Sequence, residues 1–262
     1  MFQDIVLGLL QGLTEFLPIS SSGHLVVVPA VLGWDEPSLT FDVLLHLGTL
    51  VAVVIYFRHE LIGLALGILG RGVDPTAARR MALYLAIGTV PAAVAGLVLG
   101  DFFERLFESP YTTCAELVAT ALILLALERL GERTRRRPLD TAVATGIGVA
   151  QAVAIFPGIS RSGATIGAGL AMGLTREEST RFSFLLSIPA IAGAGVISLA
   201  DVAGGGLDIT AGVVAGVIAS GVAGYLSIGA LIRFVRSHSL TVFAVYLLVM
   251  APLSALIIWL RR

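Results

Sequence analysis

Long apolar segments separated by short polar connections recur along the whole chain. Six of them are continuous over about 20 residues, the length that an α-helix needs to cross the hydrocarbon of a bilayer. Their apolar positions do not alternate with polar ones, which excludes the strands of a membrane β-barrel. We therefore predict membrane-spanning helices at residues 40–57, 81–100, 111–130, 181–200, 211–232 and 240–260.

Two further apolar segments, residues 1–33 and 141–174, are each interrupted in the middle by a loop rich in Pro, Ser and Gly. The pieces on either side have about 10 to 17 residues, which is too short to cross a bilayer. We predict that each segment forms a re-entrant hairpin, which enters and leaves the membrane on the same side. Irregular backbone at that depth is tolerated only where it is buried in protein or lines a polar cavity. The short segment 61–70 is predicted to lie at the surface.

The two interrupting loops are copies of one another. A shift of 140 residues superposes the segment Gln11–His24 on Gln151–Ala164. The shared positions form a scaffold: Gln11/Gln151, Phe16/Phe156, Ile19/Ile159, Ser20/Ser160, Ser22/Ser162 and Gly23/Gly163. The positions that carry chemistry differ, namely Glu15/Ile155, Ser21/Arg161 and His24/Ala164. A repeated loop with different chemistry in each copy predicts one site built from two halves.

The similarity between the two halves extends beyond the loops, with matches such as Phe41/Phe182 and Tyr84/Tyr225. We therefore predict one all-α polytopic membrane domain made of two repeats, residues 1–140 and 141–262. Each repeat holds one re-entrant hairpin and three transmembrane helices. Because three is an odd number of crossings, the second repeat is expected to be inverted in the membrane. Inverted repeats with broken helices place their site at the repeat interface, near the middle of the membrane.

The composition agrees with a membrane protein. Of the 262 residues, 56% are hydrophobic and 13% are charged, whereas a soluble domain carries about 25% charged residues. The N-terminus has neither a basic region nor a small-residue cleavage site, so we expect no removable signal peptide. A single cysteine, Cys114, excludes an internal disulfide bond.

All 17 cationic residues are arginine, and their distribution is uneven. One side of the predicted topology carries only Arg105, Arg261 and Arg262. Because arginine-rich connections stay in the cytoplasm, we predict that both termini and the first hairpin lie outside. The second hairpin then enters from the cytoplasm. The charged run from Glu132 to Arg137 belongs to this topology signal, so no nucleic-acid partner is expected.

Glycines four residues apart, such as Gly163/Gly167 and Gly212/Gly216, let helices approach closely. We interpret this spacing as helix packing. It is also compatible with a homodimer.

Arg161 is an ionisable residue inside an otherwise apolar hairpin, where it is costly and needs a counter-ion. Its guanidinium, neighbouring hydroxyls and the amides of a helix N-terminus together form a cradle for phosphate. The alternative is an arginine paired with a structural carboxylate. The residues predicted to contact the substrate beside Arg161 are Ser160, Ser162, Gly163 and Thr165, with Ser20, Ser22 and Gly23 from the first loop.

Glu15 follows Gln11 by one helical turn, so that both side chains lie on one face. A carboxylate and an amide oxygen suit a hard divalent cation, Mg²⁺ or Ca²⁺, completed by water and substrate oxygens. The alternative is a Glu15–Arg161 ion pair across the two hairpins, and the two arrangements are compatible at different stages of a reaction.

Ser21 and His24 are three residues apart, and Gly23 permits a turn that would bring the hydroxyl and the imidazole together. A histidine-activated serine is one route to nucleophilic attack. The other is a histidine that acts as base on water or as acid toward the leaving group, while the serine only holds phosphate. Asp42 and His46, one turn apart, are expected either to orient His24 or the metal, or to pair with each other.

The two loop motifs together resemble a known family. Gln11-x-x-x-Glu15 followed by Phe16-Leu-Pro-Ile-Ser-Ser-Ser-Gly-His24, with Pro157-Gly-Ile-Ser-Arg161-Ser-Gly-Ala-Thr165, is similar to the undecaprenyl-pyrophosphate phosphatases of the bacitracin-resistance type. The resemblance covers essentially the whole chain, and the family accepts Glu or Gln at the position of Gln11.

The resemblance implies a multi-pass phosphatase of the bacterial cytoplasmic (inner) membrane that converts a polyprenyl diphosphate lipid, undecaprenyl diphosphate, to the monophosphate. This recycles the lipid carrier for cell-wall synthesis. It also implies a divalent cation and a site open to the periplasmic side, with Glu15, Ser21, His24 and Arg161 as catalytic residues. The alternative is a transporter or flippase of the polyprenyl phosphate carrier, because inverted repeats with paired hairpins also describe transporters.

Overall fold

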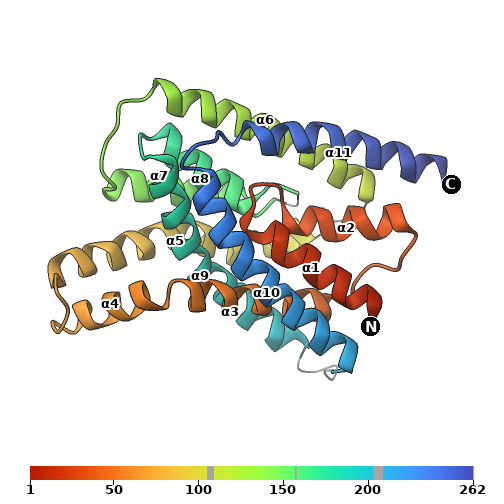
Figure 1. Ribbon diagram of the computed structural model, residues 1–262, viewed down its shortest axis with the longest axis horizontal. Coiled ribbons are helices and arrows are strands. Elements are labelled where there is room, and N and C mark those ends of the chain that lie inside the picture. Colours follow the sequence, from red (N-terminus) through yellow and green to blue (C-terminus); the bar gives the residue numbers. More distant parts are fainter. Residues whose placement is uncertain (105–108, 157, 203–208, 262) are drawn as a thin grey trace.

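The computed structural model describes residues 1–104, 109–156, 158–202 and 209–261, which form helices and connecting loops (Figure 1). In chain order the helices are α1 (Phe2–Phe16), α2 (Ser21–Leu32), α3 (Leu39–Tyr56), α4 (Arg58–Ile68), α5 (Pro75–Glu104), α6 (Pro110–Arg133), α7 (Thr141–Val153), α8 (Arg161–Ala171), α9 (Arg176–Val202), α10 (Ala211–Phe234) and α11 (Thr241–Leu260).

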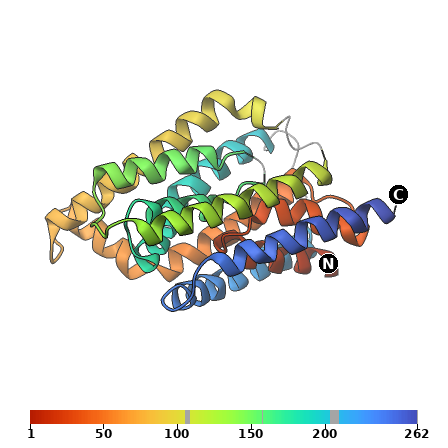
Figure 2. The ribbon, with the colours of Figure 1, turned by 90° about the horizontal axis from the view of Figure 1, so that it is seen from above.

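Six of these helices, α3, α5, α6, α9, α10 and α11, are long and apolar enough to cross a membrane. They coincide with the six predicted spans and confirm an all-α polytopic membrane protein. The last span of the first half, α6, runs beside the last span of the second half, α11 (Figure 2). Three residues of the sequence-based predictions, Arg105, Pro157 and Arg262, lie outside the described residues.

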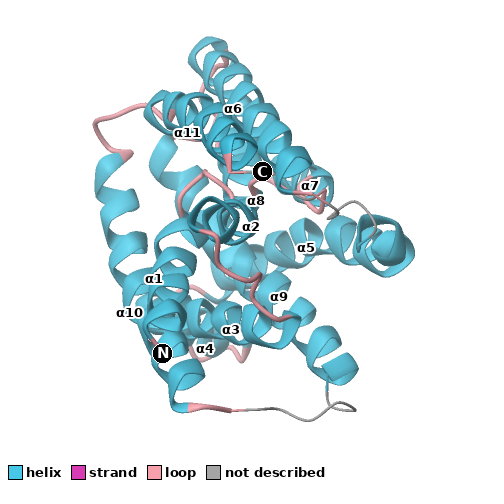
Figure 3. Ribbon diagram, turned by 90° about the vertical axis from the view of Figure 1, so that its right-hand side faces the viewer, coloured by secondary structure: helices cyan, strands magenta, loops and turns pink. Residues whose placement is uncertain are grey.

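The two interrupted segments form pairs of short helices, as predicted. α1 and α2 have 15 and 12 residues, and α7 and α8 have 13 and 11. At about 1.5 Å per residue, none of the four reaches across a hydrocarbon core of about 30 Å. The second arms of the hairpins, α2 and α8, lie in the middle of the surrounding helices (Figure 3).

Each hairpin packs mainly against a span of the other half of the chain. α1 lies along α10, where Gly8 meets the backbone of Gly216, and α7 lies along α5, where Gly148 meets the backbone of Gly88 (Figure 1). A side chain at these positions would overlap the neighbouring backbone, so glycine permits the close approach. The reciprocal packing agrees with two related repeats. The boundary at residue 140 and the inversion of the second repeat stay predictions.

The tip of the first hairpin is anchored in the core. Phe16, the last residue of α1, is fully buried and packs edge-on against Phe184 of α9, with ring centroids 5.3 Å apart. Its counterpart in the second copy, Phe156, is 41% exposed. The first tip is therefore packed into the helix core, whereas the aromatic ring of the second tip is partly exposed.

Ion pairs join helix ends at the arginine-rich face. At the start of α7, the hydrogen bond from the Val143 N–H and the Arg137 guanidinium hold the pKa of the Asp140 carboxyl below its ordinary value. The start of α9 is tied to α4, to α6 and to the segment after α10 by three pairs: Arg181–Glu60, Arg176–Glu128 and Arg236–Glu177. These contacts bring the arginines that the sequence assigned to one side into one region of the structure.

Candidate active site

The tips of the two hairpins meet. The Arg161 guanidinium, at the first position of α8, donates a hydrogen bond from Nη2 to Oε1 of Glu15 at 2.9 Å. Beside it, the Ser162 hydroxyl donates to the Leu17 carbonyl at 2.8 Å. Residues separated by 145 and 146 positions in the chain therefore touch, and the predicted Glu15–Arg161 ion pair is present in the structure.

Glu15 is the centre of this junction. Its side chain is almost fully buried, and its second oxygen, Oε2, accepts a hydrogen bond from the Ser21 hydroxyl at 2.6 Å and one from Gln11 Nε2 at 3.0 Å. The carboxylate thus has partners from both arms of the first hairpin and from the second hairpin. A buried carboxylate is costly unless it is paired and hydrogen-bonded, and Glu15 is both.

A third element, α3, brings an imidazole to the same carboxylate. His46 Nε2 lies 3.6 Å from Glu15 Oε2, and His46 Nδ1 lies 2.9 Å from the backbone oxygen of Asp42 and 3.6 Å from its carboxylate. Of the two predicted arrangements, the Asp42–His46 pair is found; the pair does not contact His24, and orientation of a metal by these residues stays a prediction. An imidazole whose other nitrogen contacts a carbonyl or a carboxylate is held in one orientation.

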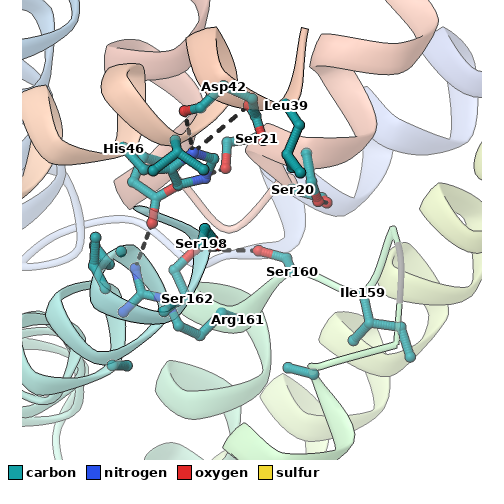
Figure 4. A pocket seen from close by; sticks show the side chains of 18 residues that line it. Ser20, Ser21, Leu39, Asp42, His46, Ile159, Ser160, Arg161, Ser162 and Ser198 are labelled. Carbon is teal, nitrogen blue, oxygen red and sulfur yellow. Dashed lines mark hydrogen bonds and ion pairs between the residues drawn. The ribbon is translucent and has the colours of Figure 1, made fainter. Parts of the chain in front are cut away.

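These groups line a cavity of about 310 Å³. Figure 4 shows Ser21, Asp42 and His46 on one side of it and Ser160, Arg161 and Ser162 on the other. The remaining wall is largely apolar and comes from α3 and α9, with Leu39, Val43, Ala190, Ile191, Ala194, Gly195 and Ser198. The cavity therefore offers a charged end at the hairpin tips and an apolar wall between two membrane-spanning helices.

Three buried polar atoms at the charged end have no hydrogen-bond partner among the described residues. Arg161 Nη1 is a donor, and Gln11 Oε1 and Asp42 Oδ1 are acceptors, the latter 3.6 Å from His46 Nδ1. Buried polar groups without partners are rare, and such groups are sites where a ligand, a water molecule or an ion can bind. Arg161 Nη1 suits a phosphate oxygen, and Gln11 Oε1 suits a cation.

Ser20, Ser22, Ser160 and Ser162 line the cavity. Ser20 Oγ and Ser160 Oγ also accept hydrogen bonds from the backbone N–H groups three residues ahead, which fixes the first turns of α2 and α8. The free amides of these turns carry the partial positive charge of a helix N-terminus. Both loops thus present helix N-termini to the same space.

Three predicted substrate contacts lie elsewhere. The Thr165 hydroxyl donates to the Arg161 carbonyl at 2.8 Å and shares a 2.6 Å hydrogen bond with Ser183 of α9, which places it beneath the loop. Gly23 packs closely on Leu117, and Gly163 packs on Ser160. None of the three lines the cavity, and their contact with the substrate stays a prediction.

The predicted pairing of Ser21 with His24 is wrong for this structure. His24 is buried away from the cavity, with Nδ1 2.7 Å from the Ser20 carbonyl and Nε2 2.9 Å from the hydroxyl of Tyr246 on α11, whose ring stacks on the imidazole. Ser21 turns the other way, toward Glu15. The imidazole at the carboxylate is that of His46, and a catalytic role of His24 stays a prediction.

Some residues that hold the two loops lie outside the sequence motifs and were not predicted. Tyr246 holds His24, and Thr120 of α6 holds the second loop by donating to the Gly158 carbonyl at 2.9 Å and accepting from the Ser160 N–H at 3.2 Å. The apolar wall from α9 was likewise not anticipated. No local signal marks these residues, because their spacing from the motifs is set only by helix packing.

The donor set at Glu15 fits a divalent cation. The Glu15 carboxylate and the unpartnered Gln11 Oε1 are hard oxygen donors of the kind that Mg²⁺ and Ca²⁺ prefer. No cluster of three or more His, Cys, Asp or Glu ligands is found among the described residues. A cation here would therefore rely on Glu15, Gln11, water and substrate oxygens, as the sequence suggested.

The sequence matches a known family over nearly its whole length. The family described as "Bacitracin resistance protein BacA" matches residues 4–253. A relative from Rubrobacter xylanophilus, named "Undecaprenyl-diphosphatase", is 46% identical over 264 residues, which cover 97% of this chain and 97% of the relative.

Two further relatives carry the same name. The protein of Moorella thermoacetica is 42% identical over 264 residues, with 100% of this chain and 99% of the relative covered. The protein of Geobacter sulfurreducens is 46% identical over 248 residues, with 92% of each chain covered. The similarity therefore includes both hairpins and all six spans.

Proposed function

Because the chain belongs to the family of the bacitracin resistance protein BacA, we propose that it acts as an undecaprenyl-diphosphatase, the name its relatives carry. It removes the terminal phosphate of undecaprenyl diphosphate, leaving undecaprenyl phosphate and inorganic phosphate, and so recycles the lipid carrier for cell-wall synthesis. One observation carries this proposal: Glu15, Ser21 and Arg161 meet where two helix N-termini face one cavity.

The second hairpin supplies phosphate binding. Arg161 Nη1 is a buried donor without a partner in the described part of the chain, so a diphosphate oxygen gains a charge-assisted hydrogen bond there. The amides at the start of α8 and α2 add donors from the same direction. The apolar wall on α3 and α9 faces the first isoprene units, and the rest of the prenyl chain stays in the surrounding lipid.

The first hairpin supplies the attacking group. Ser21 Oγ attacks the terminal phosphorus. The bond between this phosphorus and the bridging oxygen breaks, and undecaprenyl phosphate leaves. The hydroxyl proton passes to Glu15 Oε2, the oxygen that already accepts it in a 2.6 Å hydrogen bond. Water then hydrolyses the phosphoserine and releases inorganic phosphate. A phosphate that takes over Arg161 vacates Glu15 Oε1, while Oε2 stays on the Ser21 hydroxyl whose proton it accepts.

A divalent cation fits this scheme at Glu15 and Gln11. When bound, it would offset the negative charge that develops on the phosphate oxygens. Dialysis of the purified protein against a chelator should abolish phosphate release, and Mg²⁺ or Ca²⁺ should restore it. Unchanged activity after chelation would remove the cation from the scheme.

The orientation in the membrane follows from the arginines. We place the arginine-rich helix ends in the cytoplasm and the cavity toward the periplasmic side of the inner membrane, with both termini outside. Labelling of single cysteines introduced at residues 36 and 133 with an impermeant reagent, in a Cys114→Ser background, tests this. Residue 36 should react in intact cells and residue 133 only after lysis.

Phosphate release by the purified protein tests the activity itself. In detergent, without a membrane gradient, the protein should release inorganic phosphate from undecaprenyl diphosphate, and the Ser21→Ala variant should not. Acid-quenched wild-type protein with substrate labelled on the terminal phosphate should carry a phosphoserine. Absence of phosphate release from a protein that still moves the lipid between leaflets would replace the phosphatase with the flippase.

A further inference from the structure

An apolar groove runs along the outside of the molecule between α3 and α10. Its volume is about 540 Å³. It shares α3 with the candidate active site but no lining residue: His46 faces Glu15, whereas the next residues, Leu47 and Gly48, line the groove. The other lining residues are Val51, Ala52, Ile55, Val217, Ile218, Gly221, Val222, Tyr225 and Leu226. The groove is therefore an apolar surface on two helices that are long enough to span the membrane.

The groove continues into a second, polar cavity at the arginine-rich end. Tyr225 and Leu226 line both spaces, which joins them. The second cavity also has about 540 Å³ and is lined further by Tyr56, Phe57, His59, Glu60, Arg181, Gly229, Ala230 and Arg233. One continuous depression thus changes from apolar to charged along α10.

The polar end carries an excess positive charge. Arg181 pairs with Glu60 and lies over the ring of Phe57, 5.6 Å from its centroid, so its charge is compensated. Arg233, exposed in the last turn of α10, forms no ion pair with any described residue. The cavity therefore holds two guanidinium groups against one carboxylate.

We propose that this depression binds a glycerophospholipid with an anionic headgroup. An acyl chain lies in the groove between α3 and α10, and the phosphate contacts Arg233 and Arg181 at the cytoplasmic end. Tyr225 stands at the transition from apolar to polar lining, which is where tyrosine is favoured at a membrane interface. The excess positive charge selects an anionic headgroup over a zwitterionic one.

A lipid fits this depression better than a protein segment does. The groove lining offers almost no polar group to a backbone, so an extended peptide would leave its own polar groups unpaired in hydrocarbon. A helix satisfies its own backbone, but an apolar helix brings no anion to the charged end of the depression. A lipid chain has no backbone polar groups, and its charged end reaches the only charged part of the depression. The proposal depends on membrane insertion and on the arginine-rich face, and not on the phosphatase chemistry.

Lipid retention by the purified full chain tests the proposal. Native mass spectrometry of the detergent-solubilised protein, titrated with phosphatidylglycerol and with phosphatidylcholine, should show tighter binding of phosphatidylglycerol. Arg233→Gln should weaken phosphatidylglycerol binding about fivefold, the worth of one arginine at an anionic lipid surface. Arg236→Gln is the matched control, because Arg236 lies near the same helix end, pairs with Glu177 and lines neither cavity.

A second pair of variants tests the groove without touching a charge. Val222→Trp fills the groove and should reduce binding of both lipids, whereas Val214→Trp, on the same helix but outside the groove, should not. Equal phosphatidylglycerol binding in wild type and Arg233→Gln, or equal binding of the two lipids, overturns the proposal. So does a wild-type dimer that Val222→Trp converts to a monomer without loss of lipid, since the occupant would then be a second copy of the chain.

Discussion

The two hairpin tips have the same serine cap and differ in the side chains around it. In both, a serine caps the following helix: Ser20 Oγ accepts from the Gly23 N–H at 3.3 Å, and Ser160 Oγ accepts from the Gly163 N–H at 3.1 Å. The backbone reaches the cap by different routes, because Ser20 has a φ of 66° and Ser160 a φ of −66°. A non-glycine residue in the left-handed region costs about 1 kcal/mol or more, so the first tip stores strain that the second does not.

The side chains at corresponding positions of the two hairpins differ in chemistry or in partner. Glu15, with Gln11 donating to it, occupies the position that Ile155 holds in the second copy. The counterpart of Gln11, Gln151, instead donates to the Gly88 carbonyl of α5 at 3.3 Å. The same residue therefore supports the reacting carboxylate in one hairpin and helix packing in the other. A duplicated loop can thus provide two helix N-termini for one anion and still divide the chemistry between its copies.

Replacement of Glu15 should break this division most strongly. Glu15→Gln removes the proton acceptor of Ser21 and the counter-ion of Arg161, and kcat should fall by about 10³-fold. The matched control is Ile155→Ala at the corresponding position of the second hairpin, which should leave kcat close to wild type. Phosphate release by purified, monodisperse protein measures both, and similar losses in the two variants would contradict the assignment.

Arg161→Lys should have the next largest effect. Lysine keeps the positive charge but loses the planar guanidinium fork that gives two N–H groups to the phosphate oxygens, so kcat/KM should fall about 10- to 100-fold. Arg176→Lys, in a pair with Glu128 remote from the cavity, should leave kcat/KM unchanged. If Arg161→Lys kept full activity, the guanidinium geometry would have no part in substrate binding.

Replacement of His46 should affect kcat, whereas replacement of His24 should affect stability. His46→Ala should lower kcat about tenfold with little change in thermal stability, because His46 contacts the reacting carboxylate from the edge of the cavity. His24→Phe should lower stability by about 0.5–1.5 kcal/mol, because the Ser20 carbonyl keeps the backbone N–H of residue 24 but loses the imidazole, and the Tyr246 hydroxyl loses His24 Nε2, while kcat per folded molecule is retained. The reverse pattern would restore His24 as the proton-handling residue.

The smallest effect should come from the hydroxyls that both loops share. Ser162→Ala removes the hydrogen bond to the Leu17 carbonyl that joins the tips, and should cost about 1 kcal/mol of stability. Among the described residues, the hydroxyl of its counterpart Ser22 forms a hydrogen bond with Ser20 alone, at 3.3 Å, so Ser22→Ala should cost less. Thermal unfolding of both variants in the same detergent checks the order, and equal costs would mean that the Ser162 bridge adds nothing.

Most of the fold was open to prediction because it depends on local chemistry. Segment length and apolarity decide which helices span a bilayer, and the Pro/Ser/Gly loops decide where two of the segments break. The Glu15–Arg161 contact was also predictable as one of two alternatives, since a charge at membrane depth needs a partner.

The direction of individual side chains could not be predicted from the sequence in the same way. Ser21 and His24 lie within one helical turn, yet one points to Glu15 and the other to Tyr246, more than two hundred positions away. That choice is made by α11, which packs against α2 and offers His24 a ring and a hydroxyl. Spacing along a helix limits which faces are available, but the neighbouring helices decide which face meets the cavity.

The sequence by itself determined an all-helical membrane protein with two broken hairpins, and it placed the reactive residues on their tips. Both follow from the cost of exposing backbone or charge to hydrocarbon, which is a property of short segments. Only the tertiary structure decided that His46 faces Glu15, that His24 is removed from the cavity, and that α3 and α9 wall the site. These outcomes depend on contacts between distant helices, whose free energies no single segment contains.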